Sequence, residues 1–176
     1  VDVTFTVDSL TAGEVIRVTT SSREPGGKGI NVAHALLKAG ESVLALAPAH
    51  DTDPFVALAH EAHIPLRTVA VDGNVRANTT ITDATGVTTK LNEQGARLTP
   101  DTIAALEDAV ATSAAMSDVV VLAGSLPPGA PYDWYSTLVA VVRQANSDAL
   151  IAVDTSDEPL IALSEGMDQG LSLIHI

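Results

Sequence analysis

The segment Gly26-Gly-Lys-Gly-Ile-Asn31 combines residue types that suit anion binding, and it directly precedes a helical pattern. Glycine permits close approach of the backbone to a ligand and tolerates positive φ. A helix N-terminus carries partial positive charge, to which Lys28 adds a full charge. Asn31 can donate and accept hydrogen bonds, which suits a polyhydroxylated ligand. The segment predicts an anion-binding loop, although a short glycine motif alone also fits a strand-to-helix turn without a ligand.

Two more polar loops directly follow apolar segments. Gly124-Ser-Leu-Pro-Pro-Gly129 comes after one apolar run, and Asp154-Thr-Ser156 comes after another. In open α/β sheets, ligands bind beyond the carboxyl ends of the strands. Prolines stiffen the first of these two loops, which either offers the hydroxyl of Ser125 to a ligand or serves only as a rigid connection. Together the three loops predict one pocket.

Two cations accompany a Thr-rich hairpin pattern in a chain with only nine Lys and Arg residues. Arg76 precedes the hairpin and Lys90 lies in its second half. Arginine binds phosphate through two parallel hydrogen bonds, whereas lysine acts as a point charge. Arg76 is therefore the better candidate for a ligand phosphate, and Lys90 also fits the common role of a solvated charge on an edge strand.

The composition excludes several classes of partner and site. The formal net charge is −13 and no basic cluster is present, so neither nucleic acid nor an anionic membrane surface is an expected partner. The chain has no cysteine, and its five histidines show no metal-binding spacing, so we expect no metal site among these residue types. No signal-peptide pattern or membrane-spanning run is apparent, and a cytoplasmic location is expected.

Apolar strands alternate with amphipathic helices along most of the chain, which predicts βαβ units with a mostly parallel sheet and helices on both faces. The Thr-rich segments are too polar for a sheet buried on both faces, so we expect them to form a separate small sheet. The expected strands of that small sheet are residues 1–7, 14–19, 78–82 and 87–91.

These motifs are similar in order and spacing to those of the ribokinase-like (PfkB) sugar kinases, in particular the phosphosugar branch with 1-phosphofructokinase and tagatose-6-phosphate kinase. Ile30 and Val32 favour that branch over ribokinase proper. The matching motifs are Gly26-Gly-Lys-Gly-Ile-Asn-Val-Ala33, Arg76-Ala-Asn78, Thr89-Lys-Leu-Asn-Glu93 followed by Gly95, Gly124-Ser-Leu-Pro-Pro-Gly129 and Asp154-Thr-Ser156.

The resemblance implies a three-layer α/β kinase domain with a small β-sheet lid. It also implies ATP and Mg²⁺ as cofactors and a sugar phosphate as the small-molecule partner, with fructose 1-phosphate converted to fructose 1,6-bisphosphate. Arg76 would bind the existing phosphate, with Lys28 as a second candidate. Lys90 and Asn92 are further candidates. The residues implied to bind the substrate are Asp2, Gly27, Lys28, Gly29, Asn31, Arg76 and Ser125.

Two motifs of the family are absent from this sequence. These are the Lys-Pro-Asn…Glu segment linked to Mg²⁺ and nucleotide, and the Gly-Ala-Gly-Asp motif with the catalytic base. Asp157 also stands where the family usually has glycine. The expectation is an inactive N-terminal part of one kinase domain, residues 1–166, with lid segments at about 1–19 and 76–95. Residues 167–176 are expected to be a foreign or frameshifted tail.

Other functions remain open at this point. One is a sugar-phosphate-binding module without catalysis, and another is a tagatose-6-phosphate, ribose or nucleoside kinase of the same fold. The small sheet also suggests a homodimer, because exposed sheets often pair to cover one face.

Overall fold

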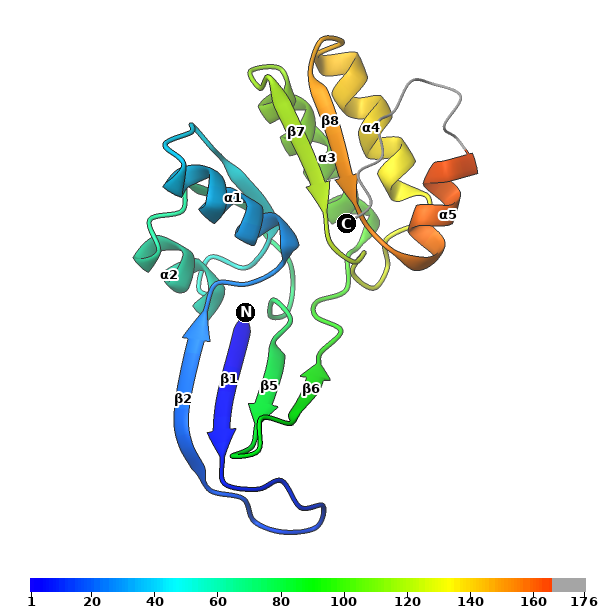
Figure 1. Cartoon of the computed structure of the whole chain (residues 1–176). Coiled ribbons are helices and arrows are strands. Elements are labelled where there is room, and N and C mark those ends of the chain that lie inside the picture. Colours follow the sequence, from blue (N-terminus) through cyan, green and yellow to red (C-terminus); the bar gives the residue numbers. More distant parts are fainter. Residues whose placement is uncertain (166–176) are drawn as a thin grey trace.

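A projecting four-stranded sheet and a body of helices and short parallel strands make up the protein, which we describe from a computed structural model (Figure 1). The structure describes residues 1–165 of the 176, so the expected tail at 167–176 lies outside the described residues. The projecting sheet is built from β1 (Asp2–Val7), β2 (Val18–Glu24), β5 (Asn78–Thr82) and β6 (Thr88–Asn92).

The strand order of the projecting sheet is β2-β1-β5-β6. β1 and β5 are parallel, whereas the two outer pairs are antiparallel. The second strand spans Val18–Glu24, so the prediction of a strand at 14–19 is wrong apart from its last residues. All seven residues of β2 are exposed. An edge strand exposed on both faces needs no alternation of apolar residues, and for that reason the sequence pattern did not mark it.

The register gives the projecting sheet one polar and one partly apolar face. Side chains paired across strands share a face. The polar face includes two adjacent cross-strand rows: one contains Asp2, Asn78 and Asn92, and the next contains Thr4, Thr80 and Lys90. The opposite face carries Val3, Phe5, Ile81 and Leu91.

The hairpin between β5 and β6 turns at Asp83, whose Oδ1 accepts hydrogen bonds from Thr85 Oγ1 at 2.6 Å and from Val87 N at 3.1 Å. The hydroxyl of Thr85 lowers the pKa of this exposed carboxyl below its usual value. Gly86 follows with a φ of 85°, a conformation that glycine adopts without strain. The predicted Thr-rich hairpin is confirmed.

The body contains two separate parallel strand pairs. One pair is β3 (Ala45–Pro48) with β4 (Leu66–Val69), and the other is β7 (Val119–Ala123) with β8 (Leu150–Asp154). The helices are α1 (Lys28–Lys38), α2 (Pro54–Glu61), α3 (Pro100–Ala114), α4 (Trp134–Ala145) and α5 (Asp157–Glu165). Parallel strands joined through helices confirm the predicted α/β class.

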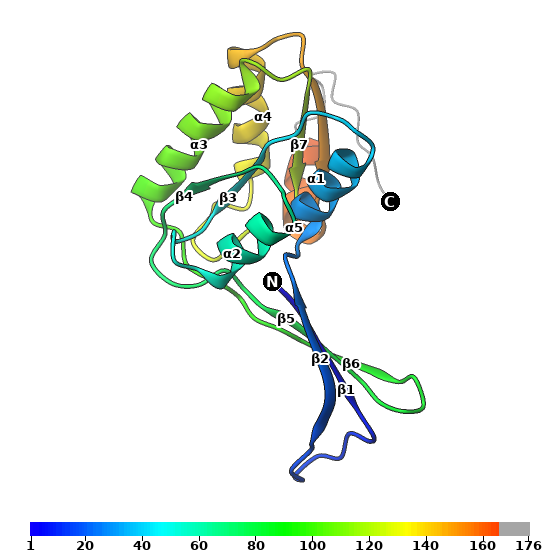
Figure 2. The same ribbon diagram turned by 90° about the vertical axis from the view of Figure 1, so that its left-hand side faces the viewer.

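Helices lie on both sides of the second strand pair (Figure 2). α3 and α4 cover one face of β7 and β8, where Val142, Leu138 and Ile151 form part of the larger core. α1 lies toward the other face and belongs to a smaller core with Phe55 and Val56 from α2. The carboxyl end of β8 lies beside the N-terminus of α1, because Lys28 at the start of α1 contacts Asp154 at the end of β8.

Local sequence signals account for where two of the helices begin. Asp53 caps α2 by accepting from Phe55 N, and Pro54 occupies the first helical position. Thr99 caps α3 in the same way, followed by Pro100. Capping oxygens satisfy N–H groups that have no partner inside the helix, and proline lacks the N–H that would need one. No helix within residues 1–165 is long and apolar enough to cross a membrane.

Candidate substrate site

The carboxylate of Asp2 lies directly against Gly26, at the start of the first glycine loop. A Cβ at position 26 would overlap the Asp2 carboxylate, so any other residue there would displace that carboxylate. Asn78 Nδ2 donates to Asp2 Oδ1 at 3.1 Å and orients the carboxylate. The structure therefore brings the first strand into contact with the first glycine loop. The sequence alone did not indicate this contact.

Within the first glycine segment, Gly26–Asn31, Gly27 is the N-cap residue of α1. Its φ is 106°, and it has no side chain that could cover the helix N-terminus. Asn31 N donates to Gly27 O at 3.0 Å and closes the first turn. Lys28, Gly29 and Asn31 are all exposed in this turn. The positive end of the helix is thus open to solvent, with a cation and an amide beside it.

Lys28 contacts the third loop, Asp154–Ser156. Its Nζ donates to Asp154 Oδ1 at 2.6 Å, and the two side chains are half and one-third exposed. Because Asp154 ends β8, this ion pair connects the N-terminus of α1 to the carboxyl end of that strand. Asp154 was recognised in a motif but not as the partner of Lys28.

The second glycine loop, Gly124–Gly129, is held by the hydroxyl groups of Tyr135 and Thr155. Gly124 has a φ of 113°, and its carbonyl accepts from Tyr135 Oη at 2.7 Å and from the buried Thr155 at 3.3 Å. Gly124 N donates to Asp154 O at 2.9 Å. Burial raises the pKa of Tyr135 to about 12. These bonds fix the loop beside β8 and leave Ser125 exposed.

Arg76 is fixed through its backbone where the chain enters the projecting sheet. Val1 N donates to Arg76 O at 2.9 Å, and Ala77 N donates to Glu93 Oε2 at 3.0 Å. Gly95, with a φ of 82°, packs so closely that an added Cβ would lie 3.1 Å from Arg76 Cβ. Among the hydrogen bonds of residues 1–165, none is made by the Arg76 guanidinium, so this cation is available to a ligand.

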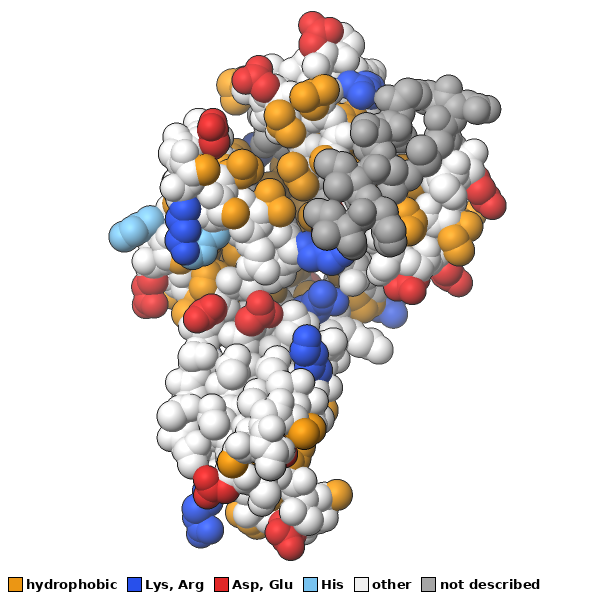
Figure 3. Space-filling view, in the orientation of Figure 1, with side chains coloured by type: hydrophobic (Ala, Val, Ile, Leu, Met, Phe, Trp, Pro, Cys, Tyr) orange, Lys and Arg blue, Asp and Glu red, His pale blue; other side chains and the backbone are white. Residues whose placement is uncertain are grey.

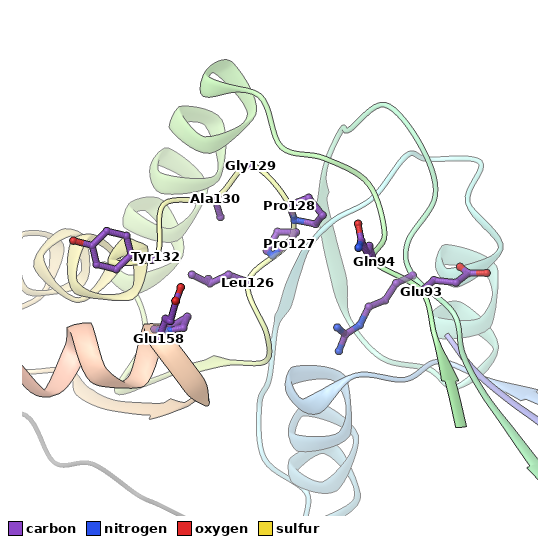
Figure 4. A pocket seen from close by; sticks show the side chains of 11 residues that line it. Glu93, Gln94, Leu126, Pro127, Pro128, Gly129, Ala130, Tyr132 and Glu158 are labelled. Atoms are coloured by element: carbon purple, nitrogen blue, oxygen red, sulfur yellow. The ribbon is translucent and has the colours of Figure 1, made fainter. Parts of the chain in front are cut away.

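Arg76 lines a cavity of about 490 Å³ between the entrance to the projecting sheet and the second glycine loop (Figure 4). Glu93 and Gln94 lie on one side of it, and Tyr132 and Glu158 on the other. Of the residues predicted to bind substrate, only Arg76 lines this cavity. Its remaining lining residues are Leu126, Pro127, Pro128, Gly129, Ala130 and Pro159.

Lys90 and Asn92 belong to the polar face of the projecting sheet. Asn92 is in the same cross-strand row as Asp2, whereas Lys90 is one row further from the body, a step of about 7 Å along a strand. Both are exposed. Asn92 is therefore nearer to the glycine loops than Lys90.

The three predicted loops come together. Asp154 and Thr155 connect the third loop to the first through Lys28 and to the second through Gly124. Lys and Arg side chains gather where the projecting sheet meets the body (Figure 3), although the whole chain is acidic. Tyr135 was not anticipated from the sequence, and Thr155 was placed in the third loop without its bond to Gly124 O, because nothing in the local sequence indicates which carbonyl a hydroxyl will reach.

Within residues 1–165 no group of three or more His, Asp or Glu side chains is arranged to hold a metal ion. The polar groups gathered at the site suit hydroxyls and an anion.

The sequence matches known carbohydrate kinases over its whole length. The model described as "pfkB family carbohydrate kinase" matches residues 1–176. A 1-phosphofructokinase of Xanthomonas campestris pv. campestris is 34% identical over 165 residues, which are 92% of this chain and 51% of that enzyme. An ATP-dependent 6-phosphofructokinase isozyme 2 of Mycobacterium tuberculosis is 30% identical over 169 residues, which are 94% of this chain and 49% of that enzyme.

The fold matches a solved kinase of the same kind. Phosphofructokinase-2 from Escherichia coli, in complex with fructose-6-phosphate, superposes with a TM-score of 0.81 and 29% identity over 92% of this chain and 53% of that chain. The present chain thus spans about half the length of the curated relatives it matches. The motifs, the ribokinase-like α/β fold and these matches show that the chain belongs to the pfkB family of carbohydrate kinases.

Proposed function

We propose that this chain supplies the sugar-binding half of an ATP-dependent phosphohexose kinase that converts fructose 1-phosphate to fructose 1,6-bisphosphate. The observation that carries the proposal is the position of Arg76, which lines a wide-open cavity of about 490 Å³ and whose guanidinium forms no hydrogen bond or ion pair within residues 1–165. A guanidinium of this kind can bind the phosphate of a sugar phosphate in a bidentate manner.

The other gathered groups suit the sugar. The carboxylate of Asp2 accepts hydrogen bonds from hydroxyls, and Asn31 and Ser125 can both donate and accept them. Gly27 and Gly29 allow the ligand to approach the N-terminus of α1 closely. Lys28 is a second phosphate ligand in this proposal, and Lys90 and Asn92 approach from the projecting sheet.

The projecting sheet acts as a lid in this proposal, with its polar face toward the substrate. Its other face carries Val3, Phe5, Ile81 and Leu91, and Leu91 is 57% exposed. We propose that a second copy of the chain covers this face in a homodimer, because apolar side chains on an exposed sheet favour pairing.

ATP is the proposed phosphoryl donor, since a relative is named as ATP-dependent. When bound with Mg²⁺ it would supply the transferred phosphoryl group and charge stabilisation. We assign neither group to residues of this chain, and we expect no turnover from the 176 residues alone. A cytoplasmic location belongs to the same proposal.

Calorimetric titration of the chain with fructose 1-phosphate and with fructose tests the proposal. We expect the phosphorylated sugar to bind more tightly, and Arg76→Ala to weaken its binding about tenfold or more, since hydrogen bonds to charged groups contribute about 1.5–3 kcal/mol. Arg23→Ala is the matched control, because Arg23 is an exposed arginine on the opposite face of the projecting sheet. Equal binding of both sugars, or no effect of Arg76→Ala, would favour a ribose or nucleoside kinase instead.

Two further measurements separate the remaining alternatives. Titration with fructose 6-phosphate and tagatose 6-phosphate identifies the hexose. Fructose 6-phosphate is the second candidate substrate after fructose 1-phosphate, because it is the ligand in the solved complex of phosphofructokinase-2 from Escherichia coli. A coupled assay of ADP release tests whether the chain turns over any of them. Binding without turnover in a protein of full family length would indicate a binding module rather than a kinase.

A further inference from the structure

Asp53 and Thr155 are the buried polar residues of the described part of the chain, and Asp53 is only 5% exposed. Both carboxylate oxygens of Asp53 accept hydrogen bonds. Oδ1 accepts from Phe55 N at 2.8 Å, and Oδ2 accepts from Val75 N at 2.8 Å. Hydrogen bonds to an ionised group are stronger than neutral ones, and burial strengthens them further.

The bond from Phe55 N caps the N-terminus of α2. Asp53 is the N-cap of α2, with extended backbone angles and Pro54 after it. Serine, threonine or asparagine could cap the helix about equally well. The cap alone therefore does not explain why the residue at this position has two acceptor oxygens.

The second bond reaches 22 residues along the chain, to the residue directly before Arg76. The neighbouring peptide groups are held from the projecting sheet: Arg76 O accepts from Val1 N, and Ala77 N donates to Glu93 Oε2. Asp53 instead belongs to the body, where it begins α2. Residues 75–77 are therefore hydrogen-bonded to the body through Asp53 and to the projecting sheet through Val1 and Glu93.

We propose that Asp53 is a positioning residue that fixes the backbone before Arg76 and so directs the guanidinium of Arg76 into the cavity. The bond from Val75 N limits rotation on one side of Arg76, and Gly95 limits displacement from behind. A fixed guanidinium loses less entropy when it binds phosphate. The ligand in this inference rests on the proposed function, whereas the anchoring of Val75 does not.

Asp53→Asn is the sharpest test, because asparagine has the same shape and caps helices equally well. Its Oδ1 can still accept from Phe55 N, but its amide nitrogen cannot accept from Val75 N. Asp53→Ser is the second variant, which keeps a capping oxygen without placing a donor near Val75. Thr99→Ala is the matched control, since it removes the N-cap of α3, where Thr102 N donates to Thr99 Oγ1 at 3.2 Å.

The first readout is amide hydrogen exchange at Val75, followed by NMR. We expect exchange about tenfold faster or more in both Asp53 variants and unchanged at this amide in Thr99→Ala, because a bond to a charged group contributes about 1.5–3 kcal/mol. The second readout is affinity for fructose 1-phosphate and for fructose. We expect both Asp53 variants to lose affinity for the phosphorylated sugar alone, with no further loss when Arg76→Ala is added.

The outcomes distinguish the two proposals. Wild-type exchange at Val75 in both Asp53 variants would overturn the anchoring. Faster exchange with unchanged affinity for fructose 1-phosphate would overturn the positioning of Arg76. If the wild-type chain bound no sugar phosphate, the proposed function would fail together with the role of Asp53 in binding, while the exchange data would still decide the anchoring.

Discussion

Lys28 Nζ lies 2.6 Å from Asp154 Oδ1, which joins the N-terminus of α1 to the carboxyl end of β8. The two residues are 126 positions apart in the sequence. The cation that the glycine motif offers to an anion is therefore already paired with a carboxylate. A ligand phosphate would have to compete with Asp154 for Lys28. Arg76 forms no ion pair within residues 1–165, although the carboxylates of Glu93 and Glu158 line the same cavity.

The Lys28–Asp154 pair should affect ligand binding more than stability. Both side chains are substantially exposed, and exposed pairs contribute about 0.2–1 kcal/mol. A double-mutant cycle of Lys28→Met and Asp154→Asn, measured by urea unfolding, should give a coupling energy in that range. Asp154→Asn should strengthen binding of fructose 1-phosphate by roughly 0.5–1 kcal/mol, because it removes the competing charge.

Lys28→Met is the control for that gain in affinity and should weaken binding of the same ligand. The gain from Asp154→Asn should also shrink as salt is added. A weaker rather than stronger affinity in Asp154→Asn would show that Asp154 serves to orient Lys28 instead of competing for it.

Gly95→Ala should reduce affinity for a phosphorylated sugar by displacing Arg76. The φ of Gly95 is 82°, so any L-residue there is strained by about 1–2 kcal/mol. In addition, the new Cβ would lie 3.1 Å from Arg76 Cβ and 3.3 Å from Arg76 N. Gly86→Ala is the matched control, because Gly86 has a φ of 85° and no atom within 4 Å of an added Cβ.

Both glycine variants should lose stability in thermal unfolding, because both place alanine in the left-handed region, and Gly95→Ala should lose somewhat more because its Cβ also crowds Arg76. Only Gly95→Ala should lose affinity in calorimetry. If Gly86→Ala lost as much affinity as Gly95→Ala, the close approach of Gly95 to Arg76 would have no bearing on the site.

Tyr135 should make the protein less stable at alkaline pH. Burial raises its pKa to about 12 in the folded state, whereas an unfolded tyrosine titrates near pH 10. The folded state therefore binds the proton more tightly. Its stabilising effect is complete below about pH 10 and is lost as the pH rises to about 12, by up to about 3 kcal/mol.

Tyr135→Phe should remove that alkaline loss, and at neutral pH it should cost about 1 kcal/mol for the bond to Gly124 O. Urea unfolding at pH 8 and pH 11 measures both effects. Tyr132→Phe is the control, because Tyr132 is 64% exposed, and it should keep the alkaline loss of the wild type. The same pH dependence in Tyr135→Phe as in the wild type would assign the loss to another group.

Asp157→Gly should stabilise the protein. Asp157 has a φ of 59° at the position where the resemblance to the family implies glycine, and glycine adopts this conformation without strain. We expect a gain of about 0.5–1 kcal/mol, less than the full strain because aspartate tolerates this region better than most residues. Asp157→Ala should instead destabilise. Chemical denaturation of the three proteins compares them, and a loss of stability in Asp157→Gly would mean that the bond from Ser156 Oγ to Asp157 Oδ2 matters more.

The alternation of apolar strands with amphipathic helices predicted the α/β class of the body correctly. In the structure, Asp53 with Pro54 and Thr99 with Pro100 stand where α2 and α3 begin, and such caps and first-turn prolines act within a few residues. Reasoning from the sequence pattern failed at β2, which spans Val18–Glu24 rather than 14–19. This strand is exposed along its whole length, and it is defined by pairing with β1 rather than by its own pattern of apolar residues.

Motif identity and spacing were enough to indicate the family, because both are properties of the linear chain. Tertiary structure decided the partners of the site residues. It paired Lys28 with Asp154, placed Gly95 behind Arg76, and turned the second oxygen of Asp53 toward Val75. Hydrogen bonds and close contacts act only over a few ångströms. Between residues 22 or 126 positions apart they therefore depend on how the packed helices and strands bring distant segments together.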